Sequence, residues 1–464
     1  MTALPTRRPT LLPLLAVAAA VVLALATQLA GTLPAAGPTG MDEPLLDAPL
    51  SGEDADAVTA GAVDPAVELG RARDDVTFWA GRVAADPSDI VAAVKLADAD
   101  ATEARLTGDV TAYTRALTAA EVALAAQPGY VPAQASKATV LVALHRFPEA
   151  RDLARSILDR DPGNATALGV LGDASLELGD LARAGGAYQT LRLTAPGAAS
   201  SVRDGRLAFV RGDPAGAVAA DEAAVTAATA DALEGDPLAF YHVTLGEMLL
   251  ATGDETGARG AFEDALAVRA DQPAALVGLA KLDAFDGDLD TAIARMDTAL
   301  DAIPAPDWLA RRSDLLVLRD GPGDADAAAA DRATIEAIAS LAGEAGSVYD
   351  RGLSIYLSDR GLEPERAVRL ARDELAIRPD VYGYDTLAWA LVNAGDAAAA
   401  DAPMHDALAA GTRDARLWYH AGVIAAELGR AAEARTYLED ALALGPALDP
   451  VARARAEGVL GTLR

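Results

Sequence analysis

The chain has 464 residues, of which 52% are hydrophobic but only 4% aromatic, so its apolar content is mainly Ala, Leu and Val. Because Ala and Leu are strong helix formers and sheets need more β-branched and aromatic residues, this composition favours an all-α protein. A net charge of −30 argues against nucleic acid as a partner. The chain has no cysteine, which excludes disulfides and thiolate metal sites, and its four scattered histidines predict no metal site.

Residues 1–33 have the pattern of a segment that inserts into a membrane. Arg7 and Arg8 precede 23 uncharged residues, Leu11–Leu33, and acidic residues begin only after them. That length can span a hydrocarbon core of roughly 30 Å, and the charge asymmetry predicts an N-in, C-out orientation. Ala24-Leu25-Ala26 offers the alternative of a cleaved signal peptide and secretion. We favour an uncleaved anchor, because the cleavage motif lies inside the apolar run. Both alternatives put the rest of the chain outside the cytoplasm of a bacterial cell.

Residues 34–70 are predicted to form a flexible, acidic linker. Pro, Gly, Ala and Asp dominate this stretch, as in the run from Pro34 to Gly40. No apolar period of 3.6 residues survives there, so no helix is expected.

Internal repetition follows the linker and is the strongest pattern in the chain. A Gly-Asp pair recurs between apolar-periodic segments, where Gly can end one helix and Asp can cap the next. The pairs begin at Gly108, Gly179, Gly212, Gly253, Gly287 and Gly395. An alanine follows at or near five residues beyond such a turn, and many units close on a proline. Pro128, Pro162 and Pro196 are 34 residues apart.

These features resemble the tetratricopeptide repeat, whose 34-residue unit carries a W-x₂-L-G-x₂-Y…A-x₃-F…P pattern. The unit from Ala165 matches at Leu168, Leu171, Gly172, Ala184, Tyr188 and Pro196. The unit from Ala239 matches at Leu245, Gly246, Ala258 and Phe262, and the unit from Ala415 at Trp418, Gly422, Ala434, Leu438 and Pro446. The resemblance covers about three-quarters of the chain.

The resemblance implies an all-α, right-handed α-solenoid of about nine to ten helix-turn-helix units over residues 71–449. We expect units to start near Asp86, Val131, Ala165, Ala198, Ala239, Pro273, Asp307, Val348, Val381 and Ala415. Irregular sequence predicts a looser seam near residues 307–346 and another near Asp221, which stands where the repeat usually has an aromatic ring. Residues 450–464 are predicted to form the capping helix that a solenoid end needs.

Catalytic signatures are missing from the sequence. No phosphate-binding G-x-x-x-x-G-K-[ST] loop, H-E-x-x-H or G-x-S-x-G motif occurs. Gly321-Pro322-Gly323 follows no predicted strand and is interpreted as a turn between helices. We therefore expect a protein that is not an enzyme and that needs no cofactor.

A concave groove is the candidate binding surface, because the resemblance implies that the first helix of each unit lines it. The candidate binding residues are those at the inward positions of these helices: Arg206, Phe209, Phe240, Glu247, Lys281, Phe285, Tyr349, Tyr356, Tyr382, Trp389 and Tyr419. In the last two units, Asp385, Asn393, Arg416 and Glu427 occupy further inward positions. Aromatic side chains flanked by polar groups suit recognition of a peptide. The alternative is that these rings only pack between neighbouring units.

The sequence thus predicts a non-catalytic scaffold of the cell envelope that presents its groove to a protein or peptide partner and is held to the membrane by its N-terminal helix. A structural or assembly accessory of a membrane complex, without a peptide groove, is the second hypothesis. A sugar- or peptidoglycan-processing enzyme is disfavoured, because the repeats leave no room for a catalytic domain.

Overall fold

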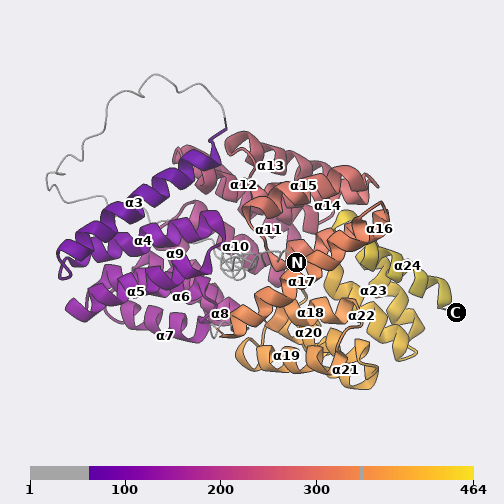
Figure 1. Ribbon diagram of the computed structural model, residues 1–464. Helices are drawn as coiled ribbons and strands as arrows, with labels where there is room; N and C mark the ends of the chain where they lie inside the picture. The colour runs from indigo at the N-terminus through magenta and orange to yellow at the C-terminus, as the bar shows by residue number, and fades with distance from the viewer. Residues whose placement is uncertain (1–61, 345–349, 464) are drawn as a thin grey trace, which may run out of the picture.

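The computed structural model describes residues 62–344 and 350–463, and over these ranges it is built from helices (Figure 1). It contains 22 α-helices and one short 3₁₀ turn, η1 (Gly445–Ala447). The only extended pairing in the described residues is an isolated bridge between Val63 and Arg269. The prediction of an all-α protein is therefore confirmed.

Ten antiparallel helix pairs follow one another along the described chain, between a single helix at each end. The flanking helices are α3 (Pro65–Ala85) and α24 (Pro450–Thr462). The first helices of the pairs are α4 (Ile90–Thr107), α6 (Val131–Ala143), α8 (Ala165–Glu177), α10 (Ala198–Val210), α12 (Gly235–Ala251), α14 (Pro273–Phe285), α16 (Pro306–Arg319), α18 (Asp350–Asp359), α20 (Val381–Asn393) and α22 (Ala415–Glu427). The second helices are α5 (Val110–Ala126), α7 (Phe147–Leu158), α9 (Leu181–Thr194), α11 (Pro214–Ala230), α13 (Glu255–Val268), α15 (Leu289–Ala302), α17 (Asp324–Glu344), α19 (Pro364–Ile377), α21 (Ala397–Leu408) and α23 (Ala431–Ala443).

The Gly-Asp pairs form the turns inside the units. Gly179 has a φ of 76°, in the left-handed region that only glycine adopts freely. The carboxylate of Asp180 accepts a hydrogen bond from the backbone N–H of Arg183 at 3.0 Å and so caps α9. Asp254 caps α13 in the same way through the N–H of Gly257 at 2.9 Å. One dipeptide thus ends the first helix and starts the second.

Small residues in the first helix allow the ring of the second helix to pack closely. A Cβ atom added to Gly172 of α8 would overlap the ring of Tyr188 in α9, and Tyr188 is fully buried. Gly246 in α12 is related to the buried ring of Phe262 in α13 in the same way. These contacts are the structural basis of the Gly and aromatic positions in the repeat pattern.

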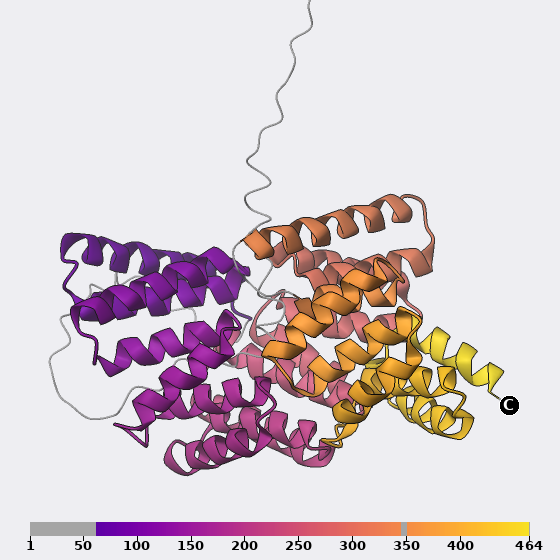
Figure 2. The same cartoon turned by 90° about the horizontal axis from the view of Figure 1, so that it is seen from below.

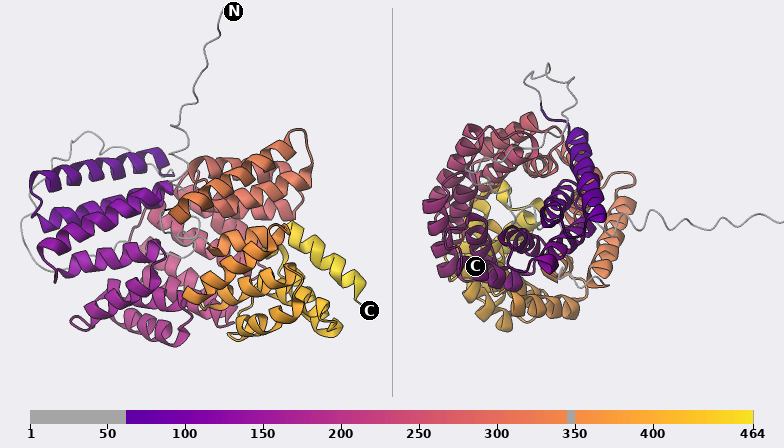
Figure 3. Two further views of the ribbon diagram at one scale, coloured as in Figure 1. Left: turned by 60° about the horizontal axis from the view of Figure 1, so that its bottom comes forward. Right: turned by 90° about the vertical axis from the view of Figure 1, so that its left-hand side faces the viewer.

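The helix pairs wind into a superhelix whose successive turns touch (Figures 2 and 3). In the right-hand view of Figure 3 the helices run around a central opening. The turn at Gly179 lies against the carbonyl oxygen of Pro379, about six units later. The hydroxyl of Thr412 donates to the carbonyl oxygen of Val210 at 2.6 Å. Contacts between residues roughly 200 positions apart therefore hold successive turns of the superhelix together.

The N-terminal boundary differs from the predicted one. Helix α3 begins at Pro65, so residues 65–70 of the predicted linker are helical. Asp64 caps the helix, and the carboxylate of Glu68 forms an ion pair with Arg269 at 2.5 Å, which local sequence could not indicate. The predicted anchor lies outside the described residues. Among the helices that are described, none is both long and apolar enough to cross a bilayer.

Candidate functional site

The inside of the superhelix contains a cavity of about 710 Å³. Its wall takes residues from the first helices α8, α10, α12, α14, α16, α18, α20 and α22. A second cavity of about 240 Å³ adjoins it and shares Glu247, Lys281, Arg311, Arg351, Arg416 and Asp449 with it. We call the two cavities together the lumen. The first helices of the units thus line the concave side, as the repeat pattern implies.

Eight of the predicted groove residues line the lumen. Arg206, Phe209, Phe240, Glu247, Lys281, Tyr382 and Arg416 line the larger cavity, and Tyr356 lines the smaller one. They come from α10, α12, α14, α18, α20 and α22, so the fold brings together side chains that are up to 210 residues apart in sequence. Phe209 and Tyr356 are themselves buried, whereas Phe240 and Tyr382 are partly accessible.

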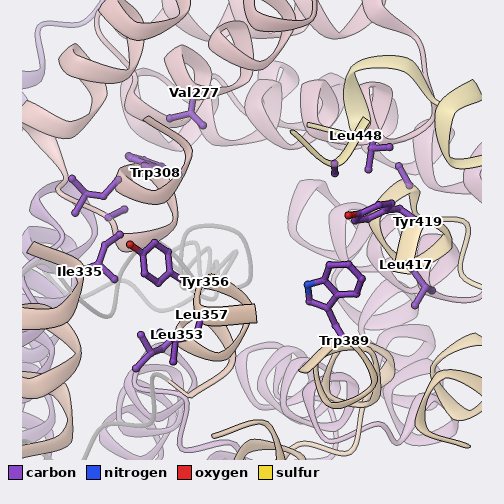
Figure 4. Close-up of a cluster of buried hydrophobic side chains, with 14 of the residues drawn as sticks. Val277, Trp308, Ile335, Leu353, Tyr356, Leu357, Trp389, Leu417, Tyr419 and Leu448 are labelled. Carbon is purple, nitrogen blue, oxygen red and sulfur yellow. The ribbon is translucent and has the colours of Figure 1, made fainter. Parts of the chain in front are cut away.

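Trp389 and Tyr419 are corrections to the predicted groove surface. Their side chains are 1% and 3% exposed and line neither cavity. The Trp389 ring stacks on His420 with centroids 3.9 Å apart, and its indole N–H donates to Asp359 at 2.7 Å. Figure 4 shows Trp389 and Tyr419 side by side, with Tyr356 and Trp308 in another part of the cluster. These two rings pack α20 against α22, which is the alternative that the sequence left open.

Among the described candidates, Phe285, Asp385, Asn393 and Glu427 also fall outside the cavity walls. The ring of Phe285 is covered by the guanidinium of Arg453, 4.8 Å from its centroid, and lies near Gly445. Phe285 therefore joins α14 to the last units instead of facing the cavities. Tyr349 lies outside the described residues.

A buried ionic cluster fixes one side of the lumen. Glu177 at the end of α8 is 2% exposed and binds both Arg206 of α10 and Arg378 at the end of α19. Glu374 forms ion pairs with Arg378 and with Arg351 of α18, each at 3.1 Å. Burial acts to raise the pKa of Glu177, but Arg378 and Arg206 outweigh it and hold that pKa below its ordinary value. Glu177 therefore keeps its charge at neutral pH, and the cluster joins two superhelical turns.

One further acidic residue that lines the lumen, Asp221, does not belong to this ionic cluster. Asp221 of α11 is 1% exposed, and neither of its carboxylate oxygens has a hydrogen-bond partner among the described residues. Burial, with a smaller contribution from Glu247, raises the pKa of Asp221 to about 8. Asp221 is therefore protonated at neutral pH, and it occupies the position where the repeat usually has an aromatic ring.

Basic residues are nearly as frequent as acidic ones in the wall of the larger cavity, although the whole chain has 39 Lys and Arg against 69 Asp and Glu. The basic residues of the larger cavity are Arg203, Arg206, Lys281, Arg311, Arg351, Arg378 and Arg416. Sequence reasoning missed Arg203, Arg311, Arg351 and Arg378. A signal existed for Arg311, which stands four residues after the unit start expected at Asp307, the same offset as Tyr419 from Ala415. Arg378 lies in a loop and faces the lumen only because the superhelix closes.

Ten helix pairs wound around a lined lumen define the protein as an α-solenoid, and the comparison with family models gives the repeat type. A tetratricopeptide-repeat model matches residues 135–201 and 386–449. The chain therefore contains tetratricopeptide repeats, a class of repeat that mediates protein–protein interactions. A comparison with curated protein sequences returns no match.

Several solved structures are similar to parts of the chain. PilW, a widely conserved type IV pilus biogenesis factor, is 19% identical over 44% of this chain and 91% of its own, with a TM-score of 0.35. A tetratricopeptide-repeat protein from Parabacteroides merdae is 19% identical over 57% of this chain and 97% of its own, with a TM-score of 0.32. A thermophilic one from Thermus thermophilus is 22% identical over 49% of this chain and 99% of its own, with a TM-score of 0.28.

Proposed function

We propose that this protein is a non-catalytic interaction scaffold whose lumen holds an extended segment of a protein partner. The observation that carries the proposal is the cavity of about 710 Å³, whose wall contains the rings of Phe240 and Tyr382 as well as the charged groups of Arg206 and Lys281. Accessible aromatic rings bounded by charged groups suit a peptide, because the rings bury apolar side chains while the charges fix orientation. The proposal needs no cofactor, and the described residues contain no cluster of metal-ligating side chains.

We further propose that the scaffold works at the cell envelope, anchored by residues 1–33 with the repeats outside the cytoplasm. The support is the uncharged stretch Leu11–Leu33 behind Arg7 and Arg8. Reporter fusions after Gly40 test the orientation, and a fusion that is active only in the cytoplasm would refute it. The mass of the mature N-terminus separates an uncleaved anchor from a cleaved signal.

Site-specific photo-crosslinking tests the use of the lumen. A photo-reactive phenylalanine analogue at Phe240 is expected to capture one discrete partner in cells. The same analogue at Leu193, which is 76% exposed and lines neither cavity, serves as the matched control. Capture at Leu193 but not at Phe240 would favour the second hypothesis, an assembly accessory that binds through its outer surface.

A further inference from the structure

Three cations in the lumen have no acidic partner within ion-pair distance among the described residues. They are Lys281 of α14, Arg311 of α16 and Arg416 of α22, and each lines both cavities. The other basic residues of the larger cavity are engaged. Arg203 binds Asp173 at 2.8 Å, for example, and Arg351 binds Asp380 at 2.7 Å.

Arg311 and Arg416 are both close enough to Lys281 to act on its charge, while the carboxylates of Asp414, Asp385 and Asp359 act on Arg416. Burial, together with the positive charges of Arg311 and Arg416, lowers the pKa of Lys281 to about 8. Glu247 and Asp307 face the same ammonium and act in the opposite direction without reversing the result. Like charges that gather in a protein-lined space without partners destabilise the fold. Such an arrangement is typical of a site that awaits a charged ligand.

We propose that Lys281, Arg311 and Arg416 form an oxyanion site that binds a carboxylate or phosphate group of the segment in the lumen. The inference rests on the proposed function and adds the chemistry of the ligand. Guanidinium groups suit it because they bind carboxylate and phosphate oxygens in a bidentate manner. Because α14 and α16 lie in the middle of the chain and α22 near its end, one anion held by all three residues bridges the middle of the superhelix to its last units.

Thermal unfolding of the full chain tests the site with inorganic phosphate as the first probe. Phosphate is expected to raise the melting temperature relative to chloride at equal ionic strength, because a ligand that binds only the folded state stabilises it. Lys281→Met, Arg311→Met and Arg416→Met are each expected to weaken phosphate binding by about tenfold or more. Without phosphate, Lys281→Met should melt at or above the temperature of the natural protein, because the repulsion from Arg311 and Arg416 is relieved.

Arg369→Met is the matched control. Arg369 is exposed on α19 and lines neither cavity, so its loss changes the net charge equally but should leave phosphate binding unchanged. A second probe, a blocked hexaglutamate peptide, distinguishes the source of the anion. Tighter binding of the peptide indicates carboxylates, and tighter binding of phosphate indicates a phosphorylated segment.

The pH dependence provides an independent readout. Affinity for either probe should fall as the pH rises through about 8, where Lys281 loses its charge, and Lys281→Arg should retain binding but lose that dependence. The site is overturned if neither probe binds, or if Arg369→Met weakens binding as much as Lys281→Met. If the probes fail while crosslinking at Phe240 still captures a partner, only the oxyanion site falls and the scaffold function stands.

Discussion

Asp221 shows how one side chain can depart from the repeat pattern and stay buried. The carboxyl lies against Gly205 of α10, where a Cβ atom would leave it too little space, so a small residue in the facing helix accommodates it. An aromatic ring at this position would fill the volume with apolar contacts. The protein instead keeps a carboxyl whose pKa is about 8, next to the lumen.

The first prediction follows from that pKa. Because folding raises it from 3.8 to about 8, the stability that the protonated group contributes is present in full below pH 3.8 and is lost as the pH rises through 8. Asp221→Asn should therefore leave stability nearly unchanged at pH 4. Above pH 8 it should increase the free energy of unfolding by at least about 2 kcal/mol, since each pKa unit is worth about 1.4 kcal/mol. Denaturant titrations at several pH values measure this.

Glu222→Gln is the control, because Glu222 is the next residue in α11 and is exposed. Its effect should be small and should not change with pH. An Asp221→Asn variant that destabilises the protein at pH 9 would contradict the assignment of a neutral Asp221.

The second prediction separates packing rings from lumen rings. Trp389→Ala should decrease the free energy of unfolding by about 3–5 kcal/mol, because the ring is buried between α20 and α22. Phe240→Ala should decrease it much less, because that ring is partly accessible. Partner capture per folded molecule should show the opposite order, with the larger loss at Phe240. Equal losses of stability in Trp389→Ala and Phe240→Ala would contradict the division into packing rings and lumen rings.

At the scale of the helix, local sequence predicted the units well. The expected starts at Val131, Ala165, Ala198, Val381 and Ala415 coincide with the first residues of α6, α8, α10, α20 and α22. They could be predicted because the turn glycine, the capping Asp and the small residues under the rings all act within one unit. The start of α12 at Gly235 was not predicted, because α11 continues to Ala230, beyond the usual unit length; the expected start was Ala239.

The candidate site was predictable only in part, because it depends on how units are placed relative to one another. The repeat register selected Phe240, Lys281 and Tyr382 correctly as inward positions. It could not separate the lumen from the interface between neighbouring first helices, so Trp389 was misplaced. Glu177 pairs with Arg206 of the next unit but also with Arg378 from a later superhelical turn, and no periodicity in the sequence specifies that distance.

The third prediction tests the contact between the two helices of one unit. Gly172→Val should decrease the free energy of unfolding by about 1–3 kcal/mol or more, because the added side chain overlaps the buried ring of Tyr188. Gly186→Ala, in α9 of the same unit, meets open space and should instead stabilise the helix by roughly 0.5–1 kcal/mol. Chemical denaturation of both variants measures these two changes in the free energy of unfolding. Destabilisation by both would mean that backbone conformation, and not the overlap with Tyr188, limits these positions.

At the scale of the whole molecule, the turn-to-turn contacts set the pitch of the superhelix. The ion pair of Arg378 with Glu177, the Thr412 hydrogen bond to Val210 and the Arg453 contact with Phe285 all join segments that neighbouring units do not bring together. An open solenoid would have none of them. Stability here therefore combines contacts between neighbouring units with closure over a complete turn.

The fourth prediction concerns that closure. Arg378→Met leaves Glu177 and Glu374 buried with fewer partners and should destabilise the closed form by about 3–5 kcal/mol. Because the units themselves are untouched, helix content by circular dichroism should stay the same while the radius of gyration in small-angle scattering increases. Arg369→Met in α19 should change neither quantity. A loss of helix content in Arg378→Met would show that closure and unit folding are one cooperative event.

The closed wall also has a consequence for how fast a ligand can arrive. A chain end can thread into the lumen along the superhelical axis, and its association rate then rises in proportion to its concentration. A loop within a folded partner has no free end, so two superhelical turns must first separate at Glu177 and Arg378. For such a ligand the observed rate reaches a plateau at the rate of opening, however much ligand is present. Stopped-flow traces over a range of concentrations would therefore distinguish a threaded tail from an enclosed loop.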